Sequence, residues 1–162
     1  MVSKVDIIIP AYKPDQKFIE LIRRLEKQSV PVNQIIVMNT EQKYFDRLIY
    51  GTPFLKEYHN ITVKHISKRE FDHGRTRNDG VHQSEAEYFV MMTQDAVPAD
   101  EHLIKELLKP LQEHKAAVSY ARQLPDAQSG VIERYTRGFN YPEQSQIKTA
   151  KDTERLGVKT FF

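Results

Sequence analysis

The sequence predicts an α/β fold built on a mostly parallel sheet with helices on both faces. Two observations support this prediction. Short apolar runs end abruptly in polar residues, and amphipathic stretches with helical spacing separate these runs along the chain. The run around which the others are organised is Phe89 to Met92, which ends in Thr93-Gln-Asp95. A continuous apolar run of this length is typical of a strand buried on both faces of a parallel sheet.

The composition is that of an ordinary globular protein. The chain has 162 residues, enough for one domain with a hydrophobic core, and its 24 basic and 22 acidic residues give a net charge of +2. These charges are interspersed, which argues against a dedicated nucleic-acid binder. The absence of cysteine excludes disulfides and thiolate metal sites. Because the sequence shows neither a signal peptide nor an apolar run of about 18 residues, we expect a soluble, cytoplasmic chain.

The first half of the chain predicts three strands and two helices. The strands are expected at Val5–Pro10, Gln34–Met38 and Ile61–Ile66, where β-branched residues gather. A shorter helix is expected from Lys43 to Ile49, and Gly51-Thr-Pro53 ends it. A longer helix follows residue 15, and its inward face is made of Phe18, Ile22, Leu25 and Ser29.

Two further helices flank the strand that precedes Asp95. Thr76 or Asn78 is expected to cap a helix that runs to about Ser84. After the strand, Asp100 is expected to cap a helix that Pro110 bends or ends. The apolar stripe of this last helix consists of Leu103, Ile104, Leu107, Leu108 and Leu111.

The pattern weakens toward the C-terminus. Ala116–Ala121 is expected to form a fifth strand, and from Gln123 onward the chain is polar and irregular. Val158–Phe162 has the pattern of a strand that ends on two phenylalanines, and exposed phenylalanines rarely end a finished domain. We therefore expect a chain truncated at its C-terminus, with an α/β core in residues 1–122 and an incomplete segment in residues 123–162.

Polar and aromatic residues should meet at one edge of this sheet, because open α/β sheets bind ligands at the carboxyl ends of their strands. Together they offer an aromatic ring, an amide, two guanidiniums and a carboxylate, a mixture that suits a nucleotide. The carboxylate can hold a hard cation, and the cation a diphosphate. Taken singly, each residue also fits a structural role such as a turn, a helix cap or packing. The segments concerned are Ala11-Tyr12, Asn39-Thr40, Arg75–Asn78 and Gln94-Asp95.

Several common nucleotide and metal motifs are absent. The sequence has no Gly-x-x-x-x-Gly-Lys-Ser/Thr loop and no Gly-x-Gly-x-x-Gly after the first strand, which argues against a P-loop and a dinucleotide site. The six histidines show neither His-x-His nor His-Glu-x-x-His spacing, so we interpret them as structural or solvated. His73 is the exception to follow, because it shares a loop with Arg75.

Five motifs along the chain resemble a known family. Val5-Asp-Ile-Ile-Ile-Pro-Ala-Tyr12 and Thr93-Gln-Asp-Ala-Val-Pro98 resemble the N-terminal part of a glycosyltransferase of family 2, which has the Rossmann-like GT-A fold. The closer similarity is to bacterial rhamnosyltransferase-like members. Phe71-Asp-His-Gly-Arg-Thr-Arg-Asn78 resembles their Phe-Asn-His-Gly-Gly-Thr-Arg-Asn loop. Tyr120–Pro125 and Phe139–Pro142 also resemble that subgroup, so the similarity spans essentially the whole chain.

The resemblance implies a function. It implies inverting transfer of a sugar, such as rhamnose, from a dTDP- or UDP-linked donor to a glycan or lipid-linked acceptor in polysaccharide biosynthesis, with Mg²⁺ or Mn²⁺ as cofactor. It also implies peripheral association of the full-length protein with the inner face of the membrane. In these terms residues 1–122 form the nucleotide-sugar-binding core, and residues 123–162 begin the acceptor side.

The resemblance also implies roles for individual residues. Asn39 would lie near the edge of the nucleobase, Arg77 would approach the base or the phosphates, and Asp95 would hold the metal on the diphosphate. The first three residues of the implied substrate-binding set would lie against the base. That set is Pro10, Ala11, Tyr12, Asn39, Gly74, Arg77, Asn78 and Gln94.

The chain departs from the family pattern at three points. Asn39 stands where the family often has an aspartate, and Asp95 is a single carboxylate where the metal motif often has two. The family's general base is expected downstream of Phe162, so the catalytic residue is unknown and we expect the fragment to bind donor without transferring it. The alternative is a catalytically silent nucleotide-binding or scaffold module of a glycan-assembly protein. A nucleotidyltransferase ranks lower, because Ala11-Tyr-Lys-Pro14 is no Gly-rich loop.

Overall fold

The computed structural model of the chain describes residues 4–125 and 129–157. They divide into two compact units, Met1–Ile104 and Lys105–Phe162, called here the core unit and the C-terminal unit. The division predicted near residue 122 concerns function and stays a prediction. The elements in chain order are β1 (Val5–Tyr12), α1 (Gln16–Glu26), β2 (Gln34–Thr40), α2 (Gln42–Ile49), α3 (Phe54–Glu57), β3 (Ile61–Ile66), α4 (His73–Val81), β4 (Tyr88–Met91), α5 (Leu103–Gln112), α6 (Val131–Asn140), a 3₁₀ turn η1 (Ala150–Asp152) and α7 (Thr153–Leu156).

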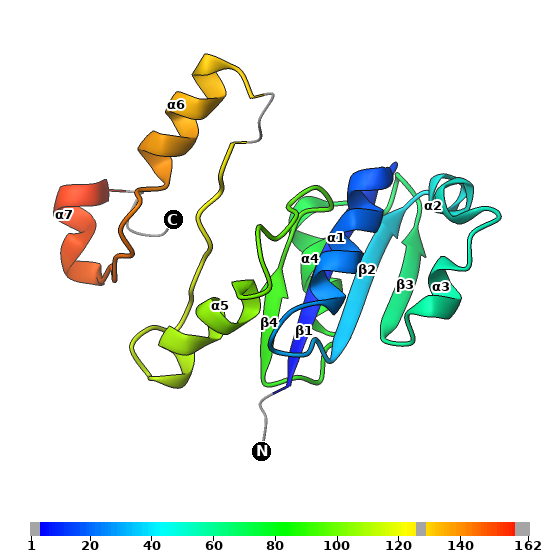
Figure 1. Cartoon of the computed structure of the whole chain (residues 1–162), viewed down its shortest axis with the longest axis horizontal. Coiled ribbons are helices and arrows are strands. Elements are labelled where there is room, and N and C mark those ends of the chain that lie inside the picture. Colours follow the sequence, from blue (N-terminus) through cyan, green and yellow to red (C-terminus); the bar gives the residue numbers. More distant parts are fainter. Residues whose placement is uncertain (1–3, 126–128, 158–162) are drawn as a thin grey trace. The chain divides into compact units, whose positions relative to one another are not determined.

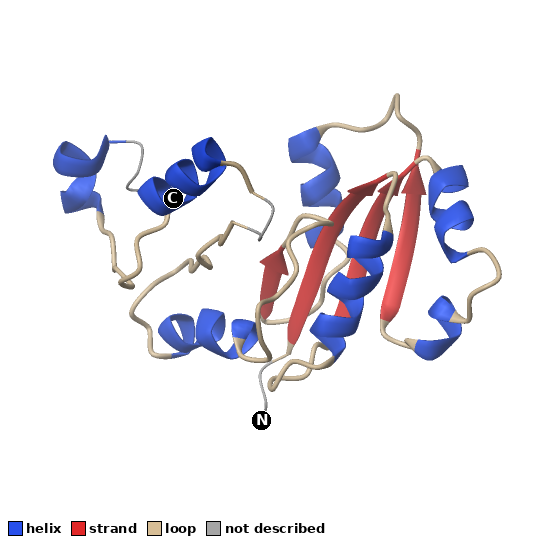
Figure 2. Ribbon diagram, turned by 45° about the horizontal axis from the view of Figure 1, so that its top comes forward, coloured by secondary structure: helices blue, strands red, loops and turns tan. Residues whose placement is uncertain are grey.

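The core unit contains one parallel sheet with the strand order β3-β2-β1-β4. All four strands point to the same edge, so their carboxyl ends lie together (Figure 2). The two central strands are fully buried along most of their length, since β1 and β2 are made of Ile, Val and Met. This confirms the predicted fold class, and all four strands of the sheet lie within two residues of the predicted bounds.

Helices cover both faces of the sheet (Figure 1). On one face, the fully buried Phe18 of α1 contacts the rings of Phe45 of α2 and Phe54 of α3, with centroid distances of 5.9 and 6.2 Å. On the other face, α4 packs on β1 and β2 around Ile8, Ile36 and Met38. Helix α4 approaches closely because Gly80 faces the sheet: a Cβ there would lie 2.5 Å from the Ile8 Cγ2 atom.

Three expectations for strands and helices are corrected in the described residues. Strand β4 is not buried on both faces; it forms the edge of the sheet and leaves Phe89 49% exposed. Ala116–Ala121 forms no strand, and Val118 and Tyr120 are exposed, because an apolar run becomes a strand only where it can pair. The polar region after Gln123 contains α6, which the sequence analysis missed. The apparent strand Val158–Phe162 lies outside the described residues.

Two further details differ from the sequence analysis. Ser29 lies beyond the end of α1 and is exposed, so it does not belong to the apolar face of that helix. Helix α3 was not predicted, since Gly51-Thr-Pro53 signalled only a break. Among the described residues, no helix is long and apolar enough to span a membrane.

Candidate functional site

Three residues lie in one row at the carboxyl ends of β1, β2 and β3. Two of them were predicted as site residues and the third was not. In the register of the sheet, Ala11 of β1 lies beside Asn39 of β2, and Asn39 lies beside His65 of β3. Tyr12 follows at the very end of β1, next to Thr40. The structure therefore gathers the predicted residues of the first two loops, and it adds His65, which the sequence analysis treated as structural.

Asn39 is the polar centre of this row. Its side chain is fully buried, and its Nδ2 atom lies 2.9 Å from His65 Nδ1. Within residues 4–125 and 129–157, the buried side-chain polar atoms without a hydrogen-bond partner are Asn39 Oδ1 and Thr40 Oγ1. Asn39 and Thr40 are consecutive residues at the end of β2, and successive side chains of a strand point to opposite faces of the sheet. Since buried polar groups are normally satisfied, an unpaired acceptor at a ligand-binding edge points to a ligand that completes it.

An aromatic surface lies beside the row. Tyr12, 39% exposed, meets the ring of Tyr44 edge to face at a centroid distance of 5.7 Å. The ammonium of Lys13 lies 5.3 Å from the Tyr12 ring centroid and 5.1 Å from that of Tyr44. Lys13 reaches this position from a left-handed backbone conformation, with φ = 48°. Two rings and a cation at a strand end can accommodate a flat, polar ligand such as a nucleobase.

Gln94, which is predicted to contact the substrate, uses both ends of its side-chain amide on the backbone of Tyr12. Its side-chain oxygen accepts the backbone N–H of Tyr12 at 2.8 Å, and its side-chain nitrogen donates to the backbone carbonyl of Tyr12 at 3.0 Å. The two hydrogen bonds connect the loop after β4 to the end of β1. They hold Tyr12 in place, and they also fix the position of Asp95, which follows Gln94 in the chain.

Asp95 lies exposed in the turn that follows β4. Within the described part of the chain, no group of three or more His, Cys, Asp or Glu residues could hold a metal ion. One exposed carboxylate nevertheless fits the way Mg²⁺ is commonly bound, through one or two carboxylates, waters and the phosphates of a substrate. The donor set therefore fits a cation shared with a diphosphate and does not fit a closed protein site.

The loop before α4 is organised by Asp72, which corrects the predicted cap. Asp72, and neither Thr76 nor Asn78, caps the helix by accepting the backbone N–H groups of Gly74 at 3.0 Å and Arg75 at 2.8 Å. These hydrogen bonds hold the pKa of the Asp72 carboxyl below its usual value, with the bond from Arg75 as the largest cause. The Gly74 N–H is therefore already used within the loop.

The other two predicted residues of α4 face outward. Arg77 is half-buried, and its Nη1 atom donates to the backbone carbonyl of His73 at 2.8 Å. Asn78 is exposed one residue further along. Helix α4 begins near the carboxyl edge of the sheet, because it follows β3 in the chain. Arg77 lies one turn into the helix, and the remaining N–H donors of its guanidinium can bind an anion.

Glu41 joins two of the loops at this edge. Its backbone N–H donates to the carbonyl of Ile66 at 2.8 Å, and its carboxylate accepts the backbone N–H of Lys68 at 3.0 Å. The Lys68 N–H, followed by the Lys43 side chain, lowers the pKa of the Glu41 carboxyl. Sequence reasoning named neither Glu41 nor Lys13 as a site residue. No signal in the sequence pointed to His65 either, because aligning the predicted ends of the second and third strands pairs Met38 with Ile66, whereas the structure pairs Met38 with Lys64.

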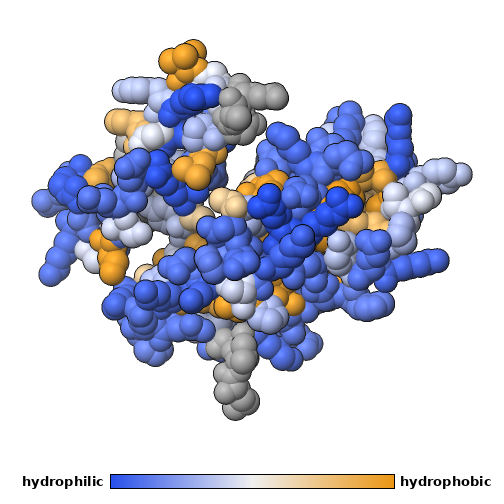
Figure 3. Space-filling model, in the orientation of Figure 1, coloured by the Kyte–Doolittle hydropathy of each residue, from blue (hydrophilic) through white to orange (hydrophobic). Residues whose placement is uncertain are grey.

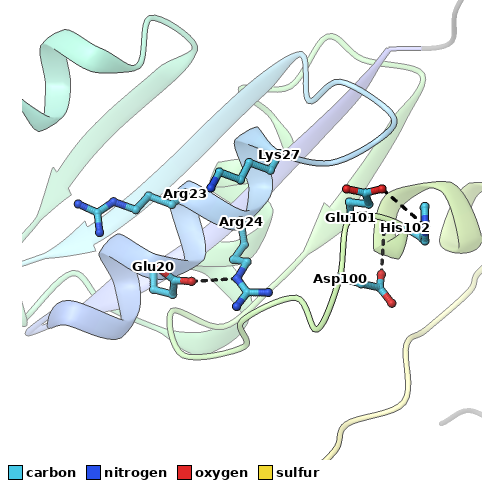
Figure 4. A pocket seen from close by; sticks show the side chains of 7 residues that line it. All are labelled: Glu20, Arg23, Arg24, Lys27, Asp100, Glu101 and His102. Carbon is cyan, nitrogen blue, oxygen red and sulfur yellow. Dashed lines mark hydrogen bonds and ion pairs between the residues drawn. The ribbon is translucent and has the colours of Figure 1, made fainter.

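A hollow away from this edge lies on the outer side of α1 (Figure 4). It has no excess charge for a phosphate, because three cationic side chains face three carboxylates, and Arg24 pairs with Glu20 at 2.8 Å. Arg24 also donates to the carbonyl of Ala99 at 3.2 Å. The residues of this hollow tie α1 to the segment before α5, and we interpret them as structural.

Comparison with known proteins agrees with this architecture. The parallel sheet with helices on both faces has the GT-A fold, and solved structures share this fold. The S. aureus TarS 1–349 in complex with UDP-GlcNAc has a TM-score of 0.59 at 22% identity, over 79% of this chain and 36% of that one. The Pyrobaculum calidifontis mannosyltransferase PcManGT, in complex with GDP-Man and Mn²⁺, has a TM-score of 0.54 at 14% identity, over 67% and 32% of the two chains.

The chain belongs to glycosyl transferase family 2, whose family model matches residues 6–162. It is 31% identical over 160 residues to the O-antigen chain rhamnosyltransferase RfbN of Salmonella typhimurium strain LT2. The matched region covers 98% of this chain and 49% of RfbN. It is 30% identical over 158 residues to the O-antigen chain rhamnosyltransferase WbaN of Salmonella anatum, which covers 96% and 48%. The chain thus spans about half the length of these curated relatives.

Proposed function

We propose that this chain is the donor-binding part of an inverting glycosyltransferase. The donor is a nucleoside diphosphate sugar linked through dTDP or UDP, with rhamnose as one candidate sugar, and the acceptor is a glycan or a lipid-linked glycan. The O-antigen names of RfbN and WbaN support the acceptor class. For the longer protein we propose a place at the inner face of the membrane. For the chain by itself, we propose donor binding without transfer, and we assign no general base within it.

The observation that carries the proposal is the pair of unsatisfied atoms at the end of β2. Asn39 Oδ1 and Thr40 Oγ1 are buried without partners, and they lie at the edge where Tyr12 offers an aromatic face. A nucleobase can both stack on the ring and donate a proton to the amide oxygen. Its diphosphate then extends toward the loop after β4, where Gln94 fixes the approach to Asp95.

The chain's own residues have clear tasks in the transfer reaction. The acceptor hydroxyl oxygen bonds to the anomeric carbon as the bond from that carbon to the diphosphate oxygen breaks, so the configuration inverts. The proton of the hydroxyl passes to a base that we do not assign within this chain. Asp95 would hold Mg²⁺ or Mn²⁺, which supplies positive charge to the departing diphosphate. Arg77 offers a guanidinium near the same edge, and its geometry suits phosphate oxygens.

Calorimetric titration with dTDP, UDP and GDP, with and without Mn²⁺, tests the proposal. We expect dTDP or UDP to bind more tightly with Mn²⁺, and Asp95→Ala to weaken that binding at least tenfold, which corresponds to about 1.4 kcal/mol. Glu26→Ala is the matched control, because Glu26 is an exposed carboxylate at the far end of α1 and should leave binding unchanged.

The same titration separates the enzyme from the silent module. Binding that Mn²⁺ does not strengthen, and that Asp95→Ala does not alter, would favour a nucleotide-binding module without transfer chemistry. The absence of binding by dTDP, UDP and GDP alike, to this chain and to the full-length protein, would contradict the donor site.

A further inference from the structure

We infer that His65 fixes the orientation of the Asn39 amide and thereby selects nucleobases that carry a ring N–H, such as uracil and thymine, over cytosine. The inference rests on the proposed function, because it assumes that a nucleobase meets Asn39. It adds a positioning residue that the motifs of the sequence did not reveal. It also explains a preference for certain bases by the hydrogen bond between Asn39 and His65 on neighbouring strands.

The contact between the two side chains determines which end of the amide is free. The Nδ2 atom of an asparagine can only donate, so its hydrogen bond of 2.9 Å requires His65 Nδ1 to accept. The His65 ring then carries its proton on Nε2. With Nδ2 held in this way, Asn39 presents Oδ1, the atom that is buried without a partner. While the proton stays on Nε2, a rotation of the amide by half a turn would place two acceptors against each other, so the opposite orientation requires the proton to move to Nδ1.

The surroundings hold the pair in place. Asn39 is fully buried, and the two residues lie opposite each other in the β2–β3 register. The ring of His65 packs edge-on against Phe45 of α2, with a centroid distance of 5.6 Å. A side chain confined by strand register on one side and by an aromatic contact on the other has little freedom to swing away from the amide.

A fixed acceptor favours some bases and rejects others. Uracil and thymine present an N3–H donor, whereas N3 of cytosine has a lone pair and no proton. A site built to accept a proton leaves both acceptors unpaired when cytosine enters, and unpaired buried polar groups make such rejection strong. UDP and CDP share the same ribose and diphosphate, so their ratio of dissociation constants reports the base contact alone.

Two substitutions separate the acceptor from the ring. His65→Phe keeps an aromatic ring against Phe45 and removes the acceptor. His65→Asn removes the ring and places an amide oxygen near the position of Nδ1. We expect the wild type to bind UDP at least tenfold more tightly than CDP, His65→Phe to reduce this ratio to about threefold or less, and His65→Asn to restore most of it.

The outcomes are distinguishable. A general loss of structure would weaken UDP and CDP binding together and leave their ratio unchanged, so an unchanged ratio in His65→Phe overturns the inference while the proposed donor site stands. A wild-type preference for CDP also overturns it, because it would mean that the amide presents its nitrogen. If the wild type binds neither UDP nor dTDP, the proposed function itself fails.

Discussion

Gly80 gives a sharp test of how the sheet and α4 are packed beneath the candidate site. It lies in the middle of the region where α4 crosses β1 and β2, and an added methyl group would meet Ile8 Cγ2 at 2.5 Å and Met38 Cγ at 3.3 Å. Carbon atoms in contact prefer about 3.5–4.0 Å, so Ile8 or the helix must withdraw by about 1 Å. Both apolar partners are fully buried and have little room to do so.

The expected loss follows from two opposing effects. Overpacking a filled core costs about 1–3 kcal/mol. Replacing a helical glycine by alanine gains about 1 kcal/mol of helix propensity, which offsets part of that cost. Gly80→Ala should therefore lower the free energy of unfolding by up to about 2 kcal/mol, a shift of roughly 4–8 °C in Tm for a chain of this size.

Gly74→Ala is the matched control in the same helix. A Cβ there meets only Asp72 Oδ1, at an ordinary contact distance of 3.6 Å, so the variant should be as stable as the wild type or slightly more stable. Urea unfolding followed by circular dichroism measures both. If Gly80→Ala is as stable as Gly74→Ala, the close packing of α4 on Ile8 is wrong.

Three further predictions concern the hydrogen bonds around the sheet. Gln94→Ala should lower the free energy of unfolding by about 1–2 kcal/mol and weaken nucleotide binding, because it removes both hydrogen bonds to Tyr12. Gln94→Glu keeps the acceptor, so its unfolding free energy and its nucleotide affinity should lie between those of the wild type and Gln94→Ala, as measured by urea unfolding and calorimetry. Asp6→Ala should cost about 2–4 kcal/mol in urea unfolding, since the buried carboxylate accepts Asn33 at 2.7 Å and Ser84 at 2.6 Å and both would lose their partner. The pKa of Asp72 is lowered from its ordinary value of 3.8, so its cap stabilises α4 fully above that pH and loses its effect as the pH falls through the lowered pKa. The difference in unfolding free energy between wild type and Asp72→Ala should therefore shrink on acidification from about pH 5. A difference that stays constant would contradict the cap.

The fold could be predicted from the sequence because its central strands carry unambiguous signals. Val5–Tyr12 and Gln34–Thr40 are runs of Ile and Val that end in polar residues, and they occupy the buried centre of the sheet. The apolar composition of a run failed to predict burial where the strand lies at the edge of the sheet. Phe89 to Met91 is as apolar as a central strand, yet it lies at the edge and is partly exposed.

The C-terminal unit shows the opposite failure. Helix α6 has its apolar residues Val131, Ile132, Tyr135 and Phe139 at helical spacing, but they are interleaved with charged side chains and are all exposed. Apolar surface over this helix is visible in Figure 3. The helical spacing was therefore present in the sequence, and the sequence analysis passed over it because the flanking segments are polar and irregular.

Within the candidate site, residues at strand ends were predictable and their partners were not. The positions of Ala11, Tyr12 and Asn39 follow from where the strands stop. The contact of Asn39 with His65 depends on the exact register between β2 and β3, which composition does not specify. The side chain of Gln94 turns toward the backbone of Tyr12, and no motif distinguishes that from a ligand contact.

The central claim is that a nucleoside diphosphate binds at the carboxyl edge of the sheet, and the most direct measurement is an amide ¹H–¹⁵N correlation spectrum titrated with UDP and dTDP in the presence of Mg²⁺. We predict the largest shift changes at Tyr12, Asn39 and Asp95, with those of Asn39 absent from a titration with inorganic diphosphate alone. Shift changes concentrated instead at Arg23–Lys27 and Asp100–His102, the hollow outside α1, would contradict the account.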